Sequence, residues 1–259
     1  MADDRPLRAG DLALLIDRKD RRYTVQLEAG GEFHSHSGLV RHDELIGGPE
    51  GRRVRSSGGA EYTVLRPTLG DFVLKMPRGA QVIYPKDLAP ILMLADIGAG
   101  DRVLESGVGS GALSTALLRA GADIVGYEIR EDFAARAVTN VERFLGSTAL
   151  ERYRVEIRDC YEGISESSLD KVVLDLAEPW RVIPHATGAM RPGGIILAYT
   201  PSIHQASQVR EALSQAPFGL AETLEVLYRT WHIEGQAVRP DHRMVGHTGF
   251  LTHARRLAD

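Results

Sequence analysis

The chain has 259 residues, of which 43% are hydrophobic and 25% are charged, and its net charge is −4. This composition is ordinary for a globular protein, and the length suits one large α/β domain or one domain with a small appendage. A single cysteine, Cys160, excludes an intrachain disulfide framework and a cysteine-rich zinc site. The apolar runs at 91–95 and 194–198 are far too short for a bilayer span, and the N-terminus lacks a signal-peptide core. We therefore expect a cytoplasmic protein with no membrane anchor.

Short β-type runs occupy the first 65 residues. They lie at 12–16, 23–27, 33–40, 45–46 and 61–65, separated by polar or glycine-rich turns. We expect residues 1–65 to form a small, barrel-like β domain. His34 and His36 would share one face of a strand, but no third ligand lies nearby. We therefore expect surface histidines and no metal.

Residues 66–100 read as a connector followed by a leading helix. Proline and glycine interrupt 66–85 too often for regular structure throughout. From Asp87 onwards, apolar residues recur at helical spacing, and Asp87 is a candidate N-cap. Gly98 and Gly100 should end this helix before the main domain begins.

From residue 101 onwards, strand-like and helix-like segments alternate. The expected strands are 102–105, 124–127, 154–157, 171–176 and 194–199, and the expected helices are 112–120, 130–145, 180–190 and 202–216. This alternation requires a mostly parallel sheet with helices on both faces. Two further strand-like runs, 221–239 and 247–257, predict a terminal antiparallel hairpin. The fold class is therefore α/β, with a Rossmann-like doubly wound sheet over 101–259 and a small N-terminal β domain.

The most informative stretch is 101–111, in which a short strand ends at Glu105 and glycines follow at 107, 109 and 111. A strand, a glycine-rich turn and a helix together indicate a nucleotide-type cofactor site, because glycine lets a ligand approach the backbone closely. The spacing differs from the G-x-G-x-x-G of dinucleotide binding, which argues against a nicotinamide dehydrogenase. It resembles the E-x-G-x-G-x-G motif of class I S-adenosylmethionine methyltransferases. A glycine-rich turn that binds no ligand is the alternative.

Acidic residues follow the next three strands. Glu128 comes about 20 residues after the glycine turn, where a carboxylate holds a ribose diol, although a helix-capping acid is the alternative. Asp159 follows the third strand, where it could accept a hydrogen bond from an adenine amino group or simply lie in a loop. Cys160 has no histidine or aspartate constellation around it, so we do not expect a catalytic thiol. Asp175 follows the fourth strand and should face the reaction zone.

Methyl transfer from a sulfonium requires an aligned lone pair and a place for positive charge to settle, rather than a strong acid. Asp175 beside an aminopurine would supply both, because its carboxylate accepts from the amino group and stabilises charge on the ring. Tyr84 and Tyr199 lie near turns and could grip a flipped base, although simple packing explains each of them equally well. Loop-borne His247 is a candidate contact, and the late histidines lack the spacing of a zinc site.

Six stretches together resemble the tRNA adenine-N1 methyltransferases of the TrmI family, which modify adenosine 58 in the T-loop, with an actinobacterial character. They are DFVLKMPRGAQ (71–81), YPKD (84–87), LESGVGSGAL (104–113), YEIREDF (127–133), DLAEPW (175–180) and GHTGFL (246–251). The resemblance spans residues 5–257, and the YPKD and DLxxPW stretches are its most diagnostic parts. Ser106 replaces an expected alanine-like residue and Ala177 a common proline; both changes leave the backbone role intact.

The resemblance implies a homotetramer that uses S-adenosylmethionine as cofactor and tRNA as substrate, without a metal or a membrane. It implies cofactor contacts for Gln81, Glu105, Ser106, Gly107, Val108, Gly109, Ser110, Gly111, Glu128, Asp159, Cys160 and Asp175. It implies substrate contacts for Arg78, Tyr84, Lys86, Tyr199 and His247. Asp175, Tyr84 and Tyr199 are the implied catalytic residues.

Two alternatives remain open. A methyltransferase that acts on a protein or a small molecule, such as an isoaspartyl-repair-like enzyme, has a similar glycine motif but lacks the N-terminal β domain and the DLxxPW stretch. A non-catalytic RNA-binding subunit would typically lose the glycine run and the acid at 175, both of which are present here.

RNA binding must also overcome the net charge of −4. The basic clusters lie at 18–22, 52–55, 239–243 and 255–256, and each alone is typical of a solvated face. The N1 atom lies on the Watson–Crick edge of adenine, so the base must leave its pairing before an enzyme can reach it. We therefore expect several basic clusters to act together across the subunits of an oligomer.

Overall fold

A computed structural model describes residues 5–79 and 81–258. Contacts divide the chain into two units, Met1–Met76 and Pro77–Asp259, so the expected connector is shared between them. Every helix among the described residues is too short or too polar to cross a bilayer.

The first unit contains two small antiparallel sheets. Its elements are β1 (Leu12–Asp17), β2 (Arg22–Gln26), β3 (Glu32–Ser35), β4 (Gly38–Arg41), the 3-10 helix η1 (His42–Glu44), β5 (Arg53–Arg55), β6 (Glu61–Leu65) and α1 (Leu69–Lys75). The larger sheet has the order β2-β1-β6-β5, and β3 pairs with β4. The rings of Phe33 in β3 and Tyr62 in β6 meet edge to face at 5.8 Å, so one apolar core joins the two sheets.

Four details of the first unit differ from expectation. The expected strand 33–40 is a hairpin, because Gly38 has a φ of +99° that reverses the chain there. His36 lies in that turn, so the expectation that it shares a strand face with His34 is wrong. The expected strand at 45–46 is a turn that directly follows η1, and the connector contains α1, which Thr68 and Asp71 start with a capping box.

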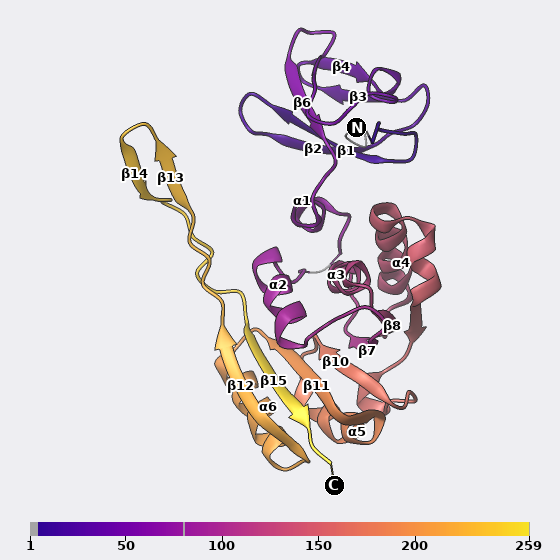
Figure 1. Ribbon diagram of the computed structural model, residues 1–259, viewed down its shortest axis with the longest axis vertical. Coiled ribbons are helices and arrows are strands. Elements are labelled where there is room, and N and C mark those ends of the chain that lie inside the picture. The colour runs from indigo at the N-terminus through magenta and orange to yellow at the C-terminus, as the bar shows by residue number, and fades with distance from the viewer. Residues whose placement is uncertain (1–4, 80, 259) are drawn as a thin grey trace. The chain divides into compact units, whose positions relative to one another are not determined.

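The second unit is a seven-stranded, mostly parallel sheet. Its elements are α2 (Pro85–Leu94), β7 (Arg102–Ser106), α3 (Ala112–Ala120), β8 (Asp123–Glu128), α4 (Glu131–Leu145), η2 (Ser147–Arg152), β9 (Tyr153–Ile157), η3 (Cys160–Glu162), β10 (Leu169–Leu174), η4 (Pro179–Val182), α5 (Ile183–Ala189), β11 (Met190–Thr200), α6 (Ile203–Ser214), β12 (Phe218–Glu225), β13 (Trp231–Glu234), β14 (Ala237–Pro240) and β15 (Phe250–Arg256). The strand order is β12-β15-β11-β10-β7-β8-β9, with β12 and β15 antiparallel at one edge. Helices cover both faces, with α5 and α6 opposite α3 and α4 (Figure 1). The predicted doubly wound fold is confirmed.

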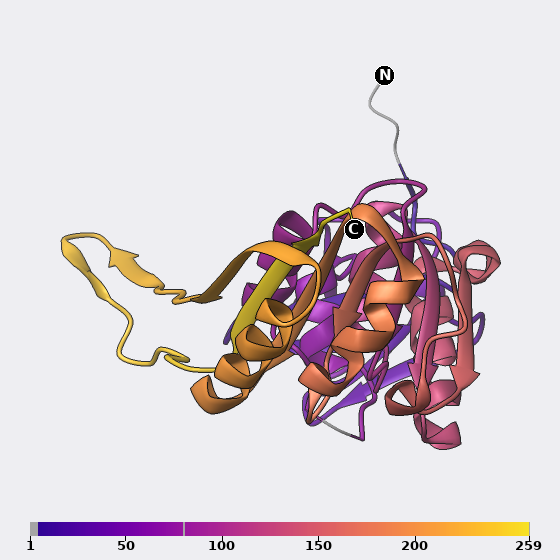
Figure 2. The same cartoon turned by 90° about the horizontal axis from the view of Figure 1, so that it is seen from below.

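The C-terminal region contains an element that the sequence pattern concealed. β12 pairs with β15 as expected, but the run 221–239 also contributes β13 and β14, which form a second hairpin. This hairpin extends as an arm beyond the β12–β15 edge (Figures 1 and 2). Its apolar side chains are exposed, with Trp231 at 55%, Ile233 at 72% and Val238 at 60%. The three side chains lie together on one short hairpin, and a contiguous exposed apolar surface of this kind is typical of an interaction site.

Candidate functional site

The site lies where the strand order of the sheet reverses. From β7 the chain proceeds outward to β8 and β9, and then returns to place β10 and β11 on the other side of β7. The glycine turn follows β7 and Asp175 follows β10. The Gly107 N–H donates to the Tyr127 carbonyl at 3.0 Å, and the Asp175 N–H donates to the Ser106 carbonyl at 2.9 Å. The ends of three neighbouring strands therefore converge on the glycine turn, which is where ligands bind in doubly wound folds.

The glycines of this turn are required by its geometry. Gly107, Gly109 and Gly111 have φ values of +87°, +56° and +82°, which other residues rarely adopt. A Cβ atom on Gly107 would lie 2.0 Å from the Asp175 carbonyl oxygen, and one on Gly111 would lie 3.0 Å from the Cα of Ala137. The turn can therefore pack against β10 and α4 only without side chains.

Glu128 is fixed at the end of β8, beside the turn. One carboxylate oxygen accepts from the Gly109 N–H at 2.9 Å, and the other accepts from the Arg130 N–H at 3.0 Å. A carboxylate offers about four acceptor positions, so these two bonds leave capacity for further donors. This geometry suits a ribose diol, as the position of Glu128 predicts.

Glu105 is fully buried under the turn. Neither of its carboxyl oxygens has a hydrogen-bond partner of ordinary geometry among the described residues, although Ser114 of α3 lies alongside. Burial raises the pKa of Glu105 to about 8, and the negative charges of Asp175 and Glu128 add to this rise. The buried hydroxyl of Ser110 likewise lacks a partner within the described part of the chain. Buried polar atoms are normally satisfied, so these groups suit a polar, positively charged ligand at the turn.

Asp159 and Cys160 begin the loop that follows β9. Asp159 caps η3, because its carboxylate accepts from the Tyr161 N–H at 2.8 Å. Cys160 is 3% exposed, and burial raises the pKa of its thiol to about 11. The thiol therefore stays protonated near neutral pH, which argues against a nucleophilic role. The adenine contact expected of Asp159 and Cys160 stays a prediction.

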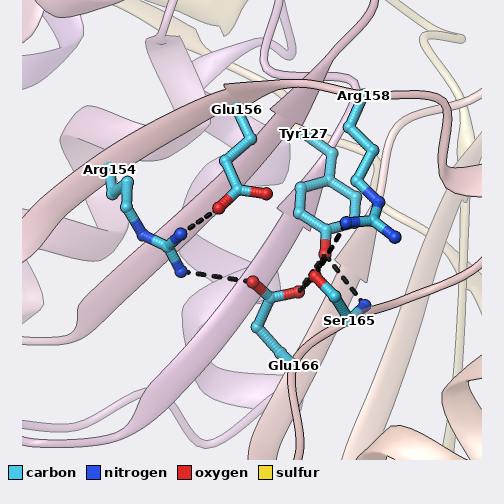
Figure 3. Close-up of polar contacts among 6 residues, drawn as sticks. All are labelled: Tyr127, Arg154, Glu156, Arg158, Ser165 and Glu166. Carbon is cyan, nitrogen blue, oxygen red and sulfur yellow. Dashed lines mark hydrogen bonds and ion pairs between the residues drawn. The ribbon is translucent and has the colours of Figure 1, made fainter.

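A buried tyrosine holds the far end of this loop (Figure 3). The Tyr127 hydroxyl accepts from the Ser165 N–H at 3.1 Å and donates to the Glu166 carboxylate. Arg158 donates to the Ser165 hydroxyl at 2.8 Å, and its guanidinium lies over the Tyr127 ring at 5.3 Å from the centroid. Arg154 also pairs with Glu166, at 3.2 Å. Tyr127 immediately precedes Glu128, so the same strand end positions both the carboxylate and the loop.

Two of the three predicted catalytic residues, Asp175 and Tyr199, follow aligned residues of the neighbouring strands β10 and β11, and the third, Tyr84, is the N-cap of α2. Asp175 is partly buried, and this burial raises its pKa to about 7. Tyr199 ends β11 and donates its hydroxyl to the Thr248 carbonyl at 2.8 Å. Burial raises the pKa of Tyr199 to about 12, and the charges of Asp87, Asp175 and Tyr84 contribute to the rise. Asp175 and Tyr199 therefore lie together at the carboxyl edge of the sheet.

The YPKD stretch has its charged residues turned inward. Asp87 is fully buried and accepts from Lys86 at 2.8 Å and from the Thr248 hydroxyl at 2.6 Å. Lys86 also donates to the Val226 carbonyl at 2.8 Å, and its side chain is 7% exposed. The N-cap of α2 is Tyr84, so the expectation that Asp87 caps this helix is wrong. These inward contacts argue against the predicted role of Lys86 as a direct substrate contact.

The other predicted substrate contacts lie at the surface. Arg78 is exposed, as is Gln81, which was predicted to contact the cofactor. The ring nitrogens of His247 contact the Glu225 carboxylate at 2.6 Å and the Pro201 carbonyl at 2.9 Å. Both partners are acceptors, so both bonds require the protonated ring, and the pKa of His247 is raised, chiefly by Glu225.

Asn140 is a structural contributor to the site that sequence reasoning missed. It is 1% exposed in α4, and its amide donates to the Ser110 and Pro77 carbonyls, both at 2.9 Å. It therefore ties the glycine turn to the segment that leads to Gln81. The available signal was its position, because an amide that follows Phe133 and Ala137 at helical spacing lies on the buried stripe of α4.

Comparison with known proteins defines the family. A model described as the tRNA methyltransferase complex GCD14 subunit matches residues 62–239, and a model of the TrmI-like N-terminal region matches residues 6–54. The chain belongs to this tRNA methyltransferase family. It is 39% identical to the tRNA (adenine(58)-N(1))-methyltransferase TrmI of Thermus thermophilus, over 94% of this chain and 96% of that protein.

Two solved structures share the fold over nearly the whole chain. An S-adenosylmethionine-dependent O-methyltransferase from Thermotoga maritima superposes with a TM-score of 0.92 at 32% identity, covering 100% of this chain and 97% of that one. The tRNA (m1A58) methyltransferase TrmI of Aquifex aeolicus superposes with a TM-score of 0.84 at 26% identity, covering 98% and 100%. The family and the fold thus show that the chain uses S-adenosylmethionine as its cofactor, and the glycine turn is the candidate site for it. The glycine turn has no room for side chains, so a ligand can approach its backbone closely, and the buried acids beside it suit a nucleoside cofactor that carries a positive charge.

Proposed function

We propose that this family member methylates N1 of adenosine 58 in the T-loop of tRNA. The observation that carries the proposal is that Asp175, which bonds to Ser106 at the glycine turn, and Tyr199 follow aligned residues of the neighbouring strands β10 and β11, while Thr248 links Tyr199 to Asp87 in the helix that Tyr84 caps. S-adenosylmethionine, when bound, supplies an electrophilic methyl group. An enzyme for adenine N1 also needs a fixed acceptor for the exocyclic amine and surfaces that hold an unstacked base, and this grouping supplies both.

In this proposal Asp175 accepts a hydrogen bond from the exocyclic amine of the target adenine. The carboxylate orients the base and stabilises the positive charge that the ring gains when N1 forms its new bond. Tyr84 and Tyr199 contact the unstacked adenine and keep it from returning to its stacked position in the tRNA. The positioned carboxylate acts electrostatically, so no proton transfer to Asp175 is required.

Glu128 would hold the ribose of the cofactor, and Asp159 and Cys160 would border its adenine. The residues from Ser106 to Gly111 and the nearby Gln81 would enclose its methionine part, with Glu105 beneath. Arg78 and His247 remain candidate RNA contacts, because both are exposed. Lys86 instead supports the site from inside, through Asp87.

We further propose that the protein acts in the cytoplasm as a homotetramer. The β13–β14 arm supports self-association, because a monomer would leave Trp231, Ile233 and Val238 in water. Light scattering on the protein as it elutes from a size-exclusion column measures the mass of the assembly and tests this proposal. A tetrameric mass that falls in a Trp231→Ser/Ile233→Ser variant is expected, and a monomeric mass for the unaltered chain would refute it.

The function is tested with methyl-labelled cofactor and two tRNA transcripts, one unmodified and one with guanosine at position 58. Label in the first alone is expected. Label in both transcripts would show that the methylated nucleotide lies elsewhere in the tRNA. Absence of label in both, together with calorimetric binding of S-adenosylhomocysteine, would favour a protein or small-molecule acceptor instead.

A further inference from the structure

The outer face of the larger sheet in the first unit gathers arginines from two separate basic clusters. β6 lies between β1 and β5, and Thr63 of β6 is aligned with Ile16 on one side and with Arg53 on the other. Residues aligned across strands share a face, so Arg53 lies on the face opposite to the core residue Tyr62. The fold therefore brings the 52–55 cluster beside the 18–22 cluster at the β1–β2 turn.

One carboxylate organises this face. The two oxygens of Glu61 pair with Arg18 at 3.0 Å and with Arg53 at 3.1 Å. The Glu61 side chain is only 14% exposed, whereas those of Arg18 and Arg53 are 79% and 73% exposed. A single carboxylate between two guanidinium groups leaves one positive charge in excess. Each guanidinium has five N–H donors, so these contacts leave most donors directed at solvent.

Two clefts flank the Arg18–Glu61 pair. One encloses about 190 Å³ between Arg18 and Arg53, above Thr63. The other encloses about 170 Å³ and is bordered by Lys19 and Arg21. Two adjoining hollows are thus bordered by Arg18, Lys19, Arg21 and Arg53, and the acids that line them among the described residues are Asp17 and Glu61.

This surface is the kind that a phosphodiester chain recognises. The first 76 residues contain twelve basic and twelve acidic residues, so the whole net charge of −4 arises from the second unit. A polyanion that approaches such a protein needs local positive charge. The planar arginine fork matches phosphate oxygens in a way that suits neither an apolar ligand nor a cation. Two adjacent hollows also match a ligand whose charges repeat along a chain.

We propose that Arg18, Arg53 and the adjoining clefts form a binding surface for the phosphate backbone of tRNA. This inference rests on the proposed function for its ligand. Contacts of this type fix the position of an RNA without reading its sequence. They would therefore hold the tRNA body while the target base is engaged at the second unit.

The test is the salt dependence of tRNA affinity for an Arg18→Ala/Arg53→Ala variant. Each lost phosphate contact should reduce the slope of log affinity against log salt by about one, so the double variant should lose about two. Its tRNA affinity should fall at low salt while its affinity for S-adenosylhomocysteine stays unchanged. An Arg18→Lys/Arg53→Lys variant keeps both charges and should restore the slope.

The matched control is Arg41→Ala in the same unit. Arg41 is similarly exposed, at 68%, and pairs with Glu32 at 3.8 Å, but it lies on the smaller sheet. Its substitution should leave the slope unchanged. An unchanged slope in the double alanine variant would overturn the proposed surface, as would a lysine variant that fails to restore it. Failure of the unaltered protein to bind tRNA at all would instead overturn the proposed function.

Discussion

The raised pKa of Asp175 makes the proposed reaction dependent on pH. Burial moves this pKa from 3.8 to about 7, a shift that corresponds to about 4 kcal/mol against the ionised form. Only the carboxylate can accept from an amine and stabilise positive charge on the base. Because the acid must lose its proton to act, activity should rise with pH through this value.

The expected size of the effect follows from the fraction ionised. With a pKa of about 7, about one tenth of Asp175 is ionised at pH 6 and about nine tenths at pH 8. The kcat/KM for S-adenosylmethionine reports the pKa values of the free enzyme, so it should rise about tenfold between these pH values. The midpoint for kcat should lie lower, because a bound cation stabilises the carboxylate.

The assay measures initial rates of tRNA methylation from pH 5.5 to 8.5 at constant ionic strength. An Asp175→Asn variant should lose at least about a hundredfold in kcat and keep its affinity for S-adenosylhomocysteine. His247 also has a raised pKa, so His247→Gln must be assayed in parallel and should keep the midpoint. A wild-type profile that is flat above pH 5, or an asparagine variant with undiminished turnover, would refute the assigned role.

Three further predictions concern the residues around the turn. The pKa of Glu105 rises from 4.5 to about 8 on folding, so the folded state loses stability as the pH rises from 4.5 to 8. Glu105→Gln should therefore raise the melting temperature above pH 8, by the equivalent of up to about 5 kcal/mol in the free energy of unfolding. The same substitution should change the melting temperature little near pH 4.5. Equal effects at both pH values in calorimetric scans would contradict this. Glu128→Gln keeps one acceptor oxygen but loses the charge, and should weaken S-adenosylhomocysteine binding by about ten- to a hundredfold in titration calorimetry. An unchanged Kd would show that Glu128 does not contact the cofactor. Tyr127→Phe removes the hydroxyl that holds the loop at Ser165 and should weaken the affinity for S-adenosylhomocysteine several-fold. The control Tyr62→Phe, which loses a hydroxyl in the first unit, should leave this affinity unchanged. Equal affinities for the two variants would show that the contact at Ser165 does not contribute to binding.

Local patterns were sufficient for the main architecture. The alternation of apolar strands with amphipathic helices predicts the doubly wound sheet, because each element carries its own periodicity. The glycine turn could be predicted equally well, because its geometry requires glycine. Positive φ values occur at 107, 109 and 111, and the backbone at 107 approaches Asp175 too closely for any side chain. Both features depend on neighbours in the sequence or on the generic geometry of a parallel sheet.

The features that were missed depend on partners that no local pattern identifies. The run 221–239 is apolar enough to be read as one strand, but its two halves belong to different sheets. Asp87 reads as a helix cap because acids favour that position, yet its partner Thr248 lies 161 residues away. Lys86 reads as a cation for RNA, yet it bonds to Val226, 140 residues away.

These distant contacts explain why a stretch that does not touch the reacting atoms can be diagnostic of the site. Thr248 donates its hydroxyl to Asp87, and its carbonyl accepts from Tyr199, so one residue links the start of α2 to the end of β11. A Cβ atom on the next residue, Gly249, would lie 2.5 Å from the Tyr199 ring, so only glycine lets the ring pack there. Tyr84 begins the helix that Asp87 anchors. The two tyrosines proposed to hold the base are therefore linked through Asp87 and Thr248, and a substitution at either of these residues should displace both.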